Sequence, residues 1–168
     1  RYVKIFASGS KAPLKATPGH FATNHAHINY YLDMTTLKTR LSEAQEVAKH
    51  LAESFLFDKV VDTIVCLEGT QVIGAYLAEE LTRAGVLSTN AHKTIYVITP
   101  EYNSNSQMVF RENILPMVHG KNVVILTAVV TTGLSLNKSI EAIQYYGGKL
   151  QSAAAVFSTL DELNGCPI

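Results

Sequence analysis

The sequence predicts an α/β fold in which a parallel sheet is flanked by helices, and three observations support this prediction. Apolar runs rich in Val and Ile recur at residues 58–67, 93–99, 121–130 and 149–158. These runs are almost continuously apolar, which is typical of parallel strands buried on both faces. Segments with helical spacing of apolar residues follow the first and third runs, at 69–85 and 134–148. Such alternation predicts a sheet covered by helices on both faces.

The composition is that of one globular domain spanning residues 1–168. Hydrophobic residues make up 47% of the chain and charged residues 17%, which excludes a disordered chain. The 14 basic and 14 acidic side chains balance, so we expect no nucleic-acid partner, because such binding needs clustered Lys and Arg. No apolar run reaches the roughly 18 residues of a membrane span, and no signal-peptide pattern is present. We therefore expect no membrane partner and a cytoplasmic location.

The two cysteines, Cys66 and Cys166, are far apart in the sequence and form no CxxC pair. This usage indicates a reducing compartment, with neither a disulfide scaffold nor a zinc site. Cys66 lies in the apolar run TIVCL and is predicted to pack as a small buried hydrophobe.

The predicted elements divide the chain into an N-terminal segment and a core. Residues 1–35 are expected to be irregular, punctuated by Gly and Pro, with one short strand-like piece in HINYYLDM. From Thr35 to Phe55 the apolar residues recur at helical spacing, which predicts a single helix of about 20 residues. Residues 36–158 then form the α/β core, in which Gly85 and Gly147 end the two later helices.

Three loops of this core are predicted to form the ligand site. In parallel α/β sheets, ligands bind beyond the carboxyl ends of the strands. This rule brings CLEGTQ, TPEYNSNSQ and TAVVTTGLS to one edge of the sheet.

The third of these loops predicts a phosphate site. Thr131, Thr132, Gly133, Leu134 and Ser135 connect a strand to a helix. Gly133 permits a turn with positive φ, so that successive amides can point at one anion, and the helix start adds partial positive charge. The alternative is a simple turn in which Ser135 caps the helix.

The sequence VVILTAVVTTGLS, from Val123 to Ser135, resembles the phosphoribosyl pyrophosphate motif of the type I phosphoribosyltransferases. LEGTQVIGAYLAEEL resembles the first loop and following helix of that family, and TPEYNSNSQMVFRENI occupies the place of its flexible lid. HFATNHAHINYYLDM resembles the hood of the orotate branch, with Phe21, Tyr30, Tyr31 and Asp33 at similar spacing. The resemblance covers roughly residues 20 to 158.

The resemblance implies a fold, a ligand and a set of site residues. The fold would be the type I phosphoribosyltransferase-like sheet with a small N-terminal hood, and the protein would be a homodimer that binds a small phosphoribosyl or nucleotide ligand. Mg²⁺ would bind together with the substrate pyrophosphate. The implied residues are Val130, Thr131, Thr132, Gly133, Leu134 and Ser135 for the 5′-phosphate, Glu68, Gly69 and Thr70 for pyrophosphate, and Phe21, Tyr30 and Tyr31 for the base.

The sequence departs from the family pattern at the residues that would do the chemistry. The two ribose-facing positions, where the family carries acids, are Thr127 and Ala128. Charge-assisted hydrogen bonds contribute about 1.5–3 kcal/mol each, so losing two implies roughly 3–6 kcal/mol, or a factor of about 10² to 10⁴ in rate. The lid offers only Arg111 as a cation for the leaving group. Glu68 is the remaining acid for a ribose or magnesium contact, unless it is simply a solvated loop acid.

Three functions follow. The first is an orotate-type enzyme that transfers ribose 5-phosphate from phosphoribosyl pyrophosphate to a nitrogen base, with Glu68 and Arg111 as candidate catalytic residues. The second is a non-catalytic sensor of a nucleotide or phosphosugar. The third is altered chemistry on another phosphorylated substrate, with Glu68 or His27 as acid or base. His25 and His27 alternate and could share a metal, but no third ligand is evident, so we predict no protein-bound metal.

Overall fold

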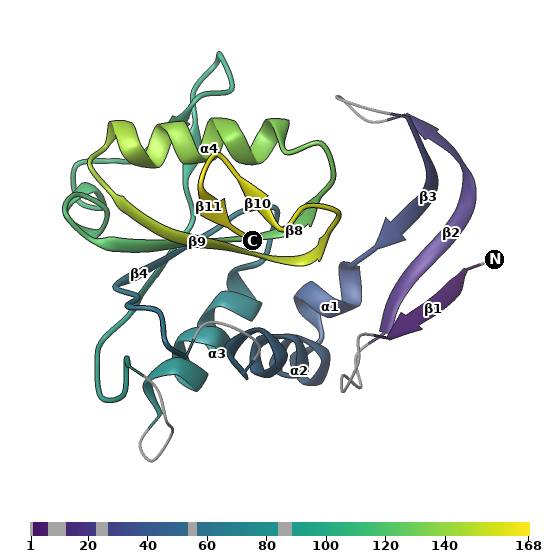
Figure 1. The fold of residues 1–168 in the computed structure, drawn as a ribbon, viewed down its shortest axis with the longest axis horizontal. Coiled ribbons are helices and arrows are strands. Elements are labelled where there is room, and N and C mark those ends of the chain that lie inside the picture. The colour runs from purple at the N-terminus through teal and green to yellow at the C-terminus, as the bar shows by residue number, and fades with distance from the viewer. Residues whose placement is uncertain (1, 7–12, 23–26, 54–56, 84–88) are drawn as a thin grey trace.

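The computed structural model describes residues 2–6, 13–22, 27–53, 57–83 and 89–168. Its centre is a parallel sheet with the strand order β5-β4-β8-β9, which Figure 1 shows between two layers of helices. The strands are β5 (Tyr96–Ile98), β4 (Thr63–Cys66), β8 (Asn122–Val130) and β9 (Lys149–Ser158). The parallel sheet predicted from the apolar runs is therefore confirmed, although β4 and β5 are shorter than their runs.

Alternate residues of the central strands pack against the two helical layers. On one face, Ile64, Cys66 and Leu126 pack with α1 (Thr35–Thr39), α2 (Leu41–Leu51) and α3 (Gln71–Thr82). On the other face, Val65 and Ile125 pack with α4 (Leu134–Tyr145). This alternation is the two-residue period of a strand, and it explains why both faces of the sheet had to be apolar. Cys66 is 2% exposed, as predicted, and burial raises the pKa of its thiol to about 12.

The prediction of a single helix from Thr35 to Phe55 is wrong, because the chain forms two helices, α1 and α2, with a break at Arg40. Arg40 has extended backbone, with φ −79° and ψ 120°. The threonines of α1 are poor helix formers, and the Thr39 hydroxyl donates to the carbonyl of Thr35 at 2.5 Å. The apolar spacing continues across the break because Leu37 and Ala44 reach the same core, whereas Leu41 is 59% exposed. Phe55 lies outside the described residues.

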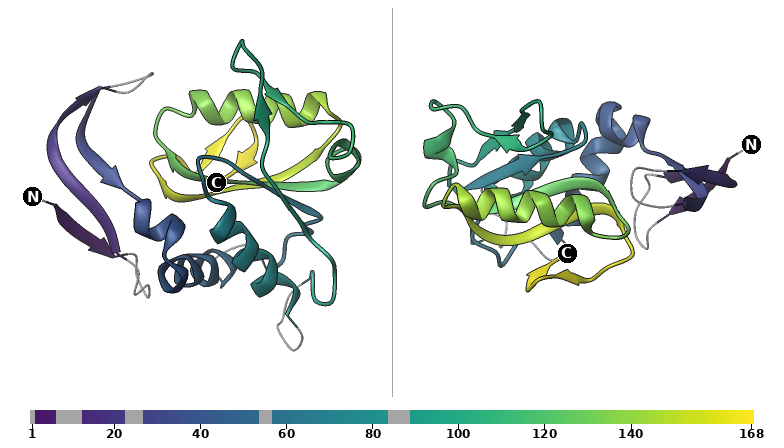
Figure 2. Two further views of the ribbon diagram at one scale, coloured as in Figure 1. Left: turned by 180° about the vertical axis from the view of Figure 1, so that it is seen from behind. Right: turned by 90° about the horizontal axis from the view of Figure 1, so that it is seen from above.

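The N-terminal segment is a three-stranded antiparallel sheet rather than irregular chain. Its strands are β1 (Val3–Phe6), β2 (Pro13–Ala22) and β3 (His27–Asp33), in the order β1-β2-β3. The register shifts between Pro18 and Phe21, at the Pro and Gly that had suggested loop structure. The sheet lies to one side of the core, on the side where α4 begins (Figures 1 and 2).

Short elements complete the chain. The lid segment forms a hairpin of β6 (Glu101–Tyr102) and β7 (Met108–Val109), and a 3₁₀ turn spans Leu115–Met117. A second hairpin, β10 (Glu162–Leu163) and β11 (Cys166–Pro167), follows β9. Neither hairpin was predicted, because strands of two residues carry no periodic signal. In the described part of the chain, no helix has the length and apolar character needed to cross a membrane.

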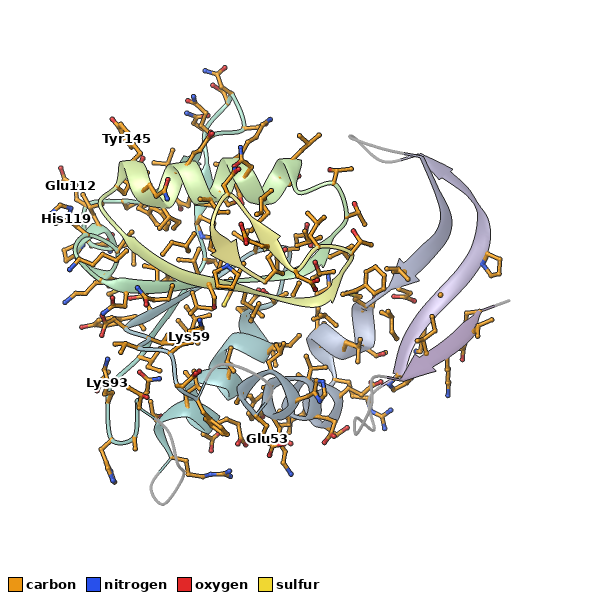
Figure 3. The ribbon with its side chains drawn as sticks, viewed as in Figure 1. Glu53, Lys59, Lys93, Glu112, His119 and Tyr145 are labelled. Atoms are coloured by element: carbon orange, nitrogen blue, oxygen red, sulfur yellow. The ribbon has the colours of Figure 1, made fainter. Side chains whose placement is uncertain are left out.

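Asp62, which precedes β4, links it to the start of β8 at the amino ends of the strands. Its carboxylate accepts hydrogen bonds from Lys93 Nζ, the Asn122 amide and Asn122 Nδ2, each at 2.8 Å. Figure 3 shows Lys93 and Lys59 at this end, away from the N-terminal sheet. Burial by itself raises the pKa of Asp62, but the hydrogen bonds from Lys93 and Asn122 together hold it below its ordinary value.

We predict that Asp62→Ala lowers the free energy of unfolding at pH 7 by about 2–3 kcal/mol, because hydrogen bonds to a charged group are lost. Since the pKa is lowered in the folded protein, this stabilisation is present above the unfolded value of about 3.9 and is lost as pH falls through the folded value. Urea unfolding of both proteins at several pH values measures the difference. The exposed Asp58→Ala is the control, and a difference that persists unchanged to pH 2 would contradict the role of Asp62.

Candidate functional site

The three predicted loops meet at the carboxyl edge of the sheet. The loop 67–70 follows β4, the lid hairpin follows β5, and the loop 131–133 follows β8. Strands β4 and β8 are neighbours, with Cys66 at the end of β4 opposite Leu126, and β8 continues to Val130, so the first loop lies beside the last residues of β8 that lead into the third loop. The arrangement expected from the α/β pattern is present.

The loop from Val130 to Ser135 has the geometry of an anion cradle. Gly133 is the N-cap of α4 and has φ 80°, the left-handed conformation that glycine adopts most readily. The N-cap makes no side-chain cap bond, and the side-chain contact at this turn is from the Leu134 amide to the Thr132 hydroxyl at 3.4 Å, so the alternative in which Ser135 is the cap is wrong. Within the described residues, no acceptor is bonded to the amides of Thr132, Gly133, Ser135 or Leu136. These open amides at the amino end of a helix suit an anion.

The segment that follows β9, residues 159–163, packs against the cradle and holds it in place. Thr159 donates its amide to the Val130 carbonyl at 3.0 Å and its hydroxyl to the Thr131 carbonyl at 2.8 Å. A Cβ on Gly133 would meet side-chain atoms of Leu160 and Leu163 at 3.1 Å. The cradle therefore has neither the backbone freedom nor the space for a larger residue at position 133.

The two positions that would carry ribose-binding acids are packed instead. Thr127 and Ala128 are each 4% exposed. Ala128 belongs to the apolar cluster that includes Met34 and Leu37. Because these side chains are buried, neither presents a group to an open ribose site in this conformation.

The loop after β4 is held in an unusual backbone conformation. Glu68 and Gly69 both have positive φ, 55° and 74°. This conformation is less stable for a non-glycine residue such as Glu68 by about 1–2 kcal/mol. Thr70 is fully buried, and its hydroxyl is bonded to the carbonyls of Leu67 at 2.7 Å and Leu126 at 3.1 Å. Thr70 therefore ties the loop to β8, while Glu68 and Gly69 are exposed.

The Glu68 carboxylate lies at the tip of β8. Its Oε2 atom is 3.3 Å from the Ala128 amide and 3.4 Å from the Val129 amide, which are long contacts for hydrogen bonds. An acid from the neighbouring loop thus lies beside the positions that lack one. The backbone carbonyl of Glu68 accepts a hydrogen bond from Lys38 Nζ at 2.9 Å. Sequence patterns did not point to Lys38, because its helix shows only packing periodicity.

The lid forms a hairpin in which the cation Arg111 is paired with an acid. Asn103 Oδ1 accepts from the amides of Asn105 at 2.9 Å and Gln107 at 3.0 Å, which closes the turn. Arg111 Nε donates to Glu101 Oε2 at 2.7 Å, with side chains 71% and 54% exposed. The cation predicted for the leaving group is thus engaged across the base of the hairpin.

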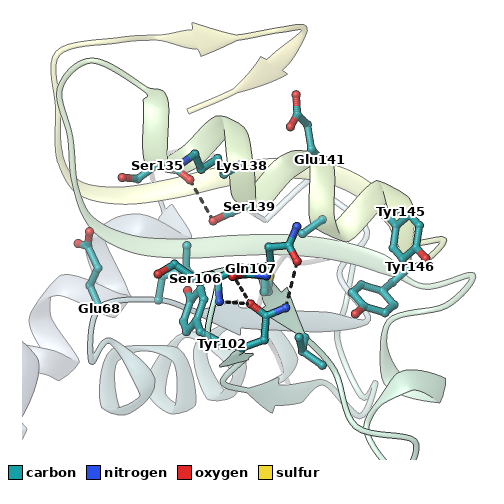
Figure 4. A pocket seen from close by; sticks show the side chains of 16 residues that line it. Glu68, Tyr102, Ser106, Gln107, Ser135, Lys138, Ser139, Glu141, Tyr145 and Tyr146 are labelled. Atoms are coloured by element: carbon teal, nitrogen blue, oxygen red, sulfur yellow. Dashed lines mark hydrogen bonds between the residues drawn. The ribbon is translucent and has the colours of Figure 1, made fainter. Parts of the chain in front are cut away.

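A groove of about 1060 Å³ runs between the lid hairpin and α4. Figure 4 shows Glu68, Tyr102 and Ser135 at this groove, together with Lys138 and Tyr145 along the helix. Burial, followed by the negative charge of Glu68, raises the pKa of the Tyr102 hydroxyl. Tyr102 and Lys138 were not predicted as site residues, since neither belongs to a recognisable motif.

The expected base-binding residues lie in the N-terminal sheet. Phe21 is opposite Ile28, Tyr30 opposite Pro18, and Tyr31 opposite Thr17; the structure describes the backbone of these residues but not their side chains. His27 begins β3, and His25 lies outside the described residues. Among the described residues, no group of three or more His, Cys, Asp or Glu side chains is placed to hold a metal.

Solved structures of phosphoribosyltransferases have the same fold as this chain. An orotate phosphoribosyltransferase from Aeropyrum pernix gives a TM-score of 0.57 at 21% identity, over 85% of this chain and 75% of that one. The Mycobacterium tuberculosis orotate phosphoribosyltransferase in complex with 5-phospho-alpha-D-ribosyl 1-diphosphate gives 0.54 at 15% identity, over 76% and 68%. The adenine phosphoribosyltransferase of Saccharomyces cerevisiae gives 0.58 at 18% identity, over 90% and 86%. No family model and no curated protein matches the sequence.

Proposed function

We propose that this chain, which has the type I phosphoribosyltransferase fold, binds a ligand containing ribose 5-phosphate with its 5′-phosphate in the cradle 130–135. The observation that carries the proposal is the Gly133 turn, which leaves open amides at the start of α4. The partial charge of the helix adds to these donors, so a phosphate is favoured over a neutral group. The M. tuberculosis structure that shares this fold contains a phosphoribosyl diphosphate, which supports the choice of ligand.

Phosphoribosyl pyrophosphate is the ligand that uses both neighbouring loops. Its diphosphate would lie at Glu68 and Gly69 while its 5′-phosphate occupies the cradle, because the Glu68 carboxylate lies 3.4 Å from the Val129 amide, next to the first residue of the cradle. Magnesium fits such a site, since it commonly binds through one or two carboxylates together with substrate phosphates. Glu68 would hold the ion, which would neutralise charge on the diphosphate.

Two functions share this binding mode. Phosphoribosyl transfer to orotate or another base is favoured by the Glu68 carboxylate, which lies at the tip of β8 beside the missing acids. A non-catalytic nucleotide or phosphosugar sensor is favoured by the burial of Thr127 and Ala128 and by the pairing of Arg111 with Glu101. Both functions require the proposed binding of the phosphoribosyl ligand. They differ in whether the bound ligand is converted to product.

Calorimetric titration tests the proposal. The protein is titrated with ribose 5-phosphate, with nucleoside monophosphates, and with phosphoribosyl pyrophosphate with and without magnesium. Binding of ribose 5-phosphate is expected, and binding of none of these ligands would overturn the proposal. Pyrophosphate release in the presence of orotate or adenine would establish the transferase, while binding without release would establish the sensor.

Glu68→Gln should weaken the binding of ribose 5-phosphate or of phosphoribosyl pyrophosphate about 3- to 10-fold, because a charge-assisted hydrogen bond exceeds a neutral one by about 1 kcal/mol. The ligand and the buffer in which the loss occurs identify the group that Glu68 contacts. A weaker affinity for ribose 5-phosphate in magnesium-free buffer would assign Glu68 to the ribose hydroxyls. A loss confined to magnesium-dependent binding of phosphoribosyl pyrophosphate would assign it to the metal. The exposed Glu79→Gln on α3 is the matched control. Unchanged affinity under both conditions would leave Glu68 as a solvated loop acid.

A further inference from the structure

We propose that Lys38 supplies the positive charge for the diphosphate of the ligand, so that this cation comes from helix α1 rather than from the lid. The inference rests on the proposed function, because it concerns the second anionic group of the same ligand. It deepens that function by naming a residue that the sequence motifs do not contain.

The Lys38 ammonium lies against the loop after β4. Its Nζ atom donates to the Glu68 carbonyl at 2.9 Å, and a Cβ on Gly69 would lie 3.9 Å from Nζ. The neighbouring Leu37 is 2% exposed and anchors this turn of α1 in the core. An ammonium carries three donors. The hydrogen bond to Glu68 uses one of them and leaves two for a ligand.

The backbone beside Lys38 offers further donors. Glu68 and Gly69 are the central residues of a turn that the Thr70 amide closes on the Leu67 carbonyl at 3.2 Å, and successive amides of a turn can form a concave anion site. Within the described residues, no acceptor is bonded to the amides of Glu68 or Gly69, whereas the amides of Leu67 and Thr70 are both bonded. Strained backbone of this sort is concentrated at ligand sites. Two open amides and an ammonium therefore meet at one place.

This second site is correctly placed for the same ligand. The Glu68 carboxylate lies 3.4 Å from the amide of Val129, the residue before the cradle begins at Val130, so the Glu68–Gly69 loop lies next to the first residue of the cradle. The lid cation Arg111 is instead paired with Glu101 at 2.7 Å. A diphosphate at this loop would consequently find its positive partner in Lys38.

The ratio of two affinities tests Lys38 separately from the cradle. Affinities for ribose 5-phosphate and phosphoribosyl pyrophosphate are measured in magnesium-free buffer for the wild type, Lys38→Met, Lys38→Arg and the exposed control Lys149→Met. We expect Lys38→Met to weaken phosphoribosyl pyrophosphate binding about 10-fold or more and ribose 5-phosphate binding less than about twofold. Lys38→Arg should restore most of the loss, because it keeps the charge.

Three results would overturn the inference. Equal losses for both ligands would mean that Lys38 only holds the loop in shape, and thermal unfolding would report that structural role directly. A larger loss of phosphoribosyl pyrophosphate affinity in Arg111→Met than in Lys38→Met would show that the lid supplies the cation. Unchanged affinities in Lys38→Met would remove Lys38 from the site while leaving the cradle intact. Failure of the wild type to bind ribose 5-phosphate would instead be a failure of the proposed function.

Discussion

Replacing Gly133 by alanine should lower the affinity for ribose 5-phosphate by at least about 10-fold, which corresponds to the loss of one charge-assisted hydrogen bond. At φ 80° an alanine costs about 1–2 kcal/mol. Its Cβ would also press on Leu160 and Leu163 at 3.1 Å. The turn must move to relieve both effects, and its amides would no longer converge on the phosphate.

Gly120→Ala is the matched control for this prediction. Gly120 also has positive φ, 69°, but a Cβ there meets nothing within 4 Å. Both variants should lose stability from backbone strain, and only Gly133→Ala should lose affinity. Calorimetric titration and thermal unfolding of the two proteins separate the effects. Equal affinities in both variants would show that the phosphate does not bind at this turn.

Gly74→Ala should destabilise the protein by about 1–3 kcal/mol, the usual cost of overpacking a core. In a solvent-exposed helix this substitution gains up to about 1 kcal/mol, so here the sign depends on the contacts. A Cβ on Gly74 would collide with Cys66 Sγ and lie 3.2 Å from Val97 Cγ1. Both neighbours lie on the strands that α3 covers, so steric overlap should exceed the helical gain. The expected fall in Tm is about 2–4 °C per kcal/mol for a chain of this size.

A double-mutant cycle with Cys66→Ala isolates the Gly74 contact. Removing Sγ creates room for the new methyl group, so the double variant should be more stable than the sum of the single effects predicts. A coupling of about 1 kcal/mol or more is expected for residues in direct contact. Additive effects in urea unfolding would contradict close packing of α3 on β4.

The sequence predicted the sheet because its signal is local and physical. Runs such as that from Val123 to Val130 are apolar at nearly every residue, and only a strand buried on both faces explains this. The N-terminal sheet was missed because β2 contains Pro13, Pro18 and Gly19, residues that usually end strands. Pro is tolerated at edges and irregularities, and the register of β2 shifts just after Pro18.

The candidate site was predicted where a motif marks it and missed where only tertiary contact makes it. The Thr-Thr-Gly turn predicted the cradle because glycine at the start of a helix has a direct conformational reason. Lys38 reaches Glu68 across thirty positions of the sequence, and Tyr102 reaches the groove from a hairpin too short to show periodicity. The packing that buries Thr127 and Ala128 also depends on neighbours that sequence spacing does not reveal.

The most direct test of the central claim is a residue-resolved titration of the ¹⁵N-labelled protein with ribose 5-phosphate, followed by amide chemical shifts. Thr132, Gly133, Ser135 and Leu136 should show the largest changes, because their open amides would receive the phosphate. Glu68 and Gly69 should join them only when phosphoribosyl pyrophosphate replaces ribose 5-phosphate. Shifts that cluster elsewhere, or none at saturating ligand, would contradict a phosphate-binding cradle at the start of α4.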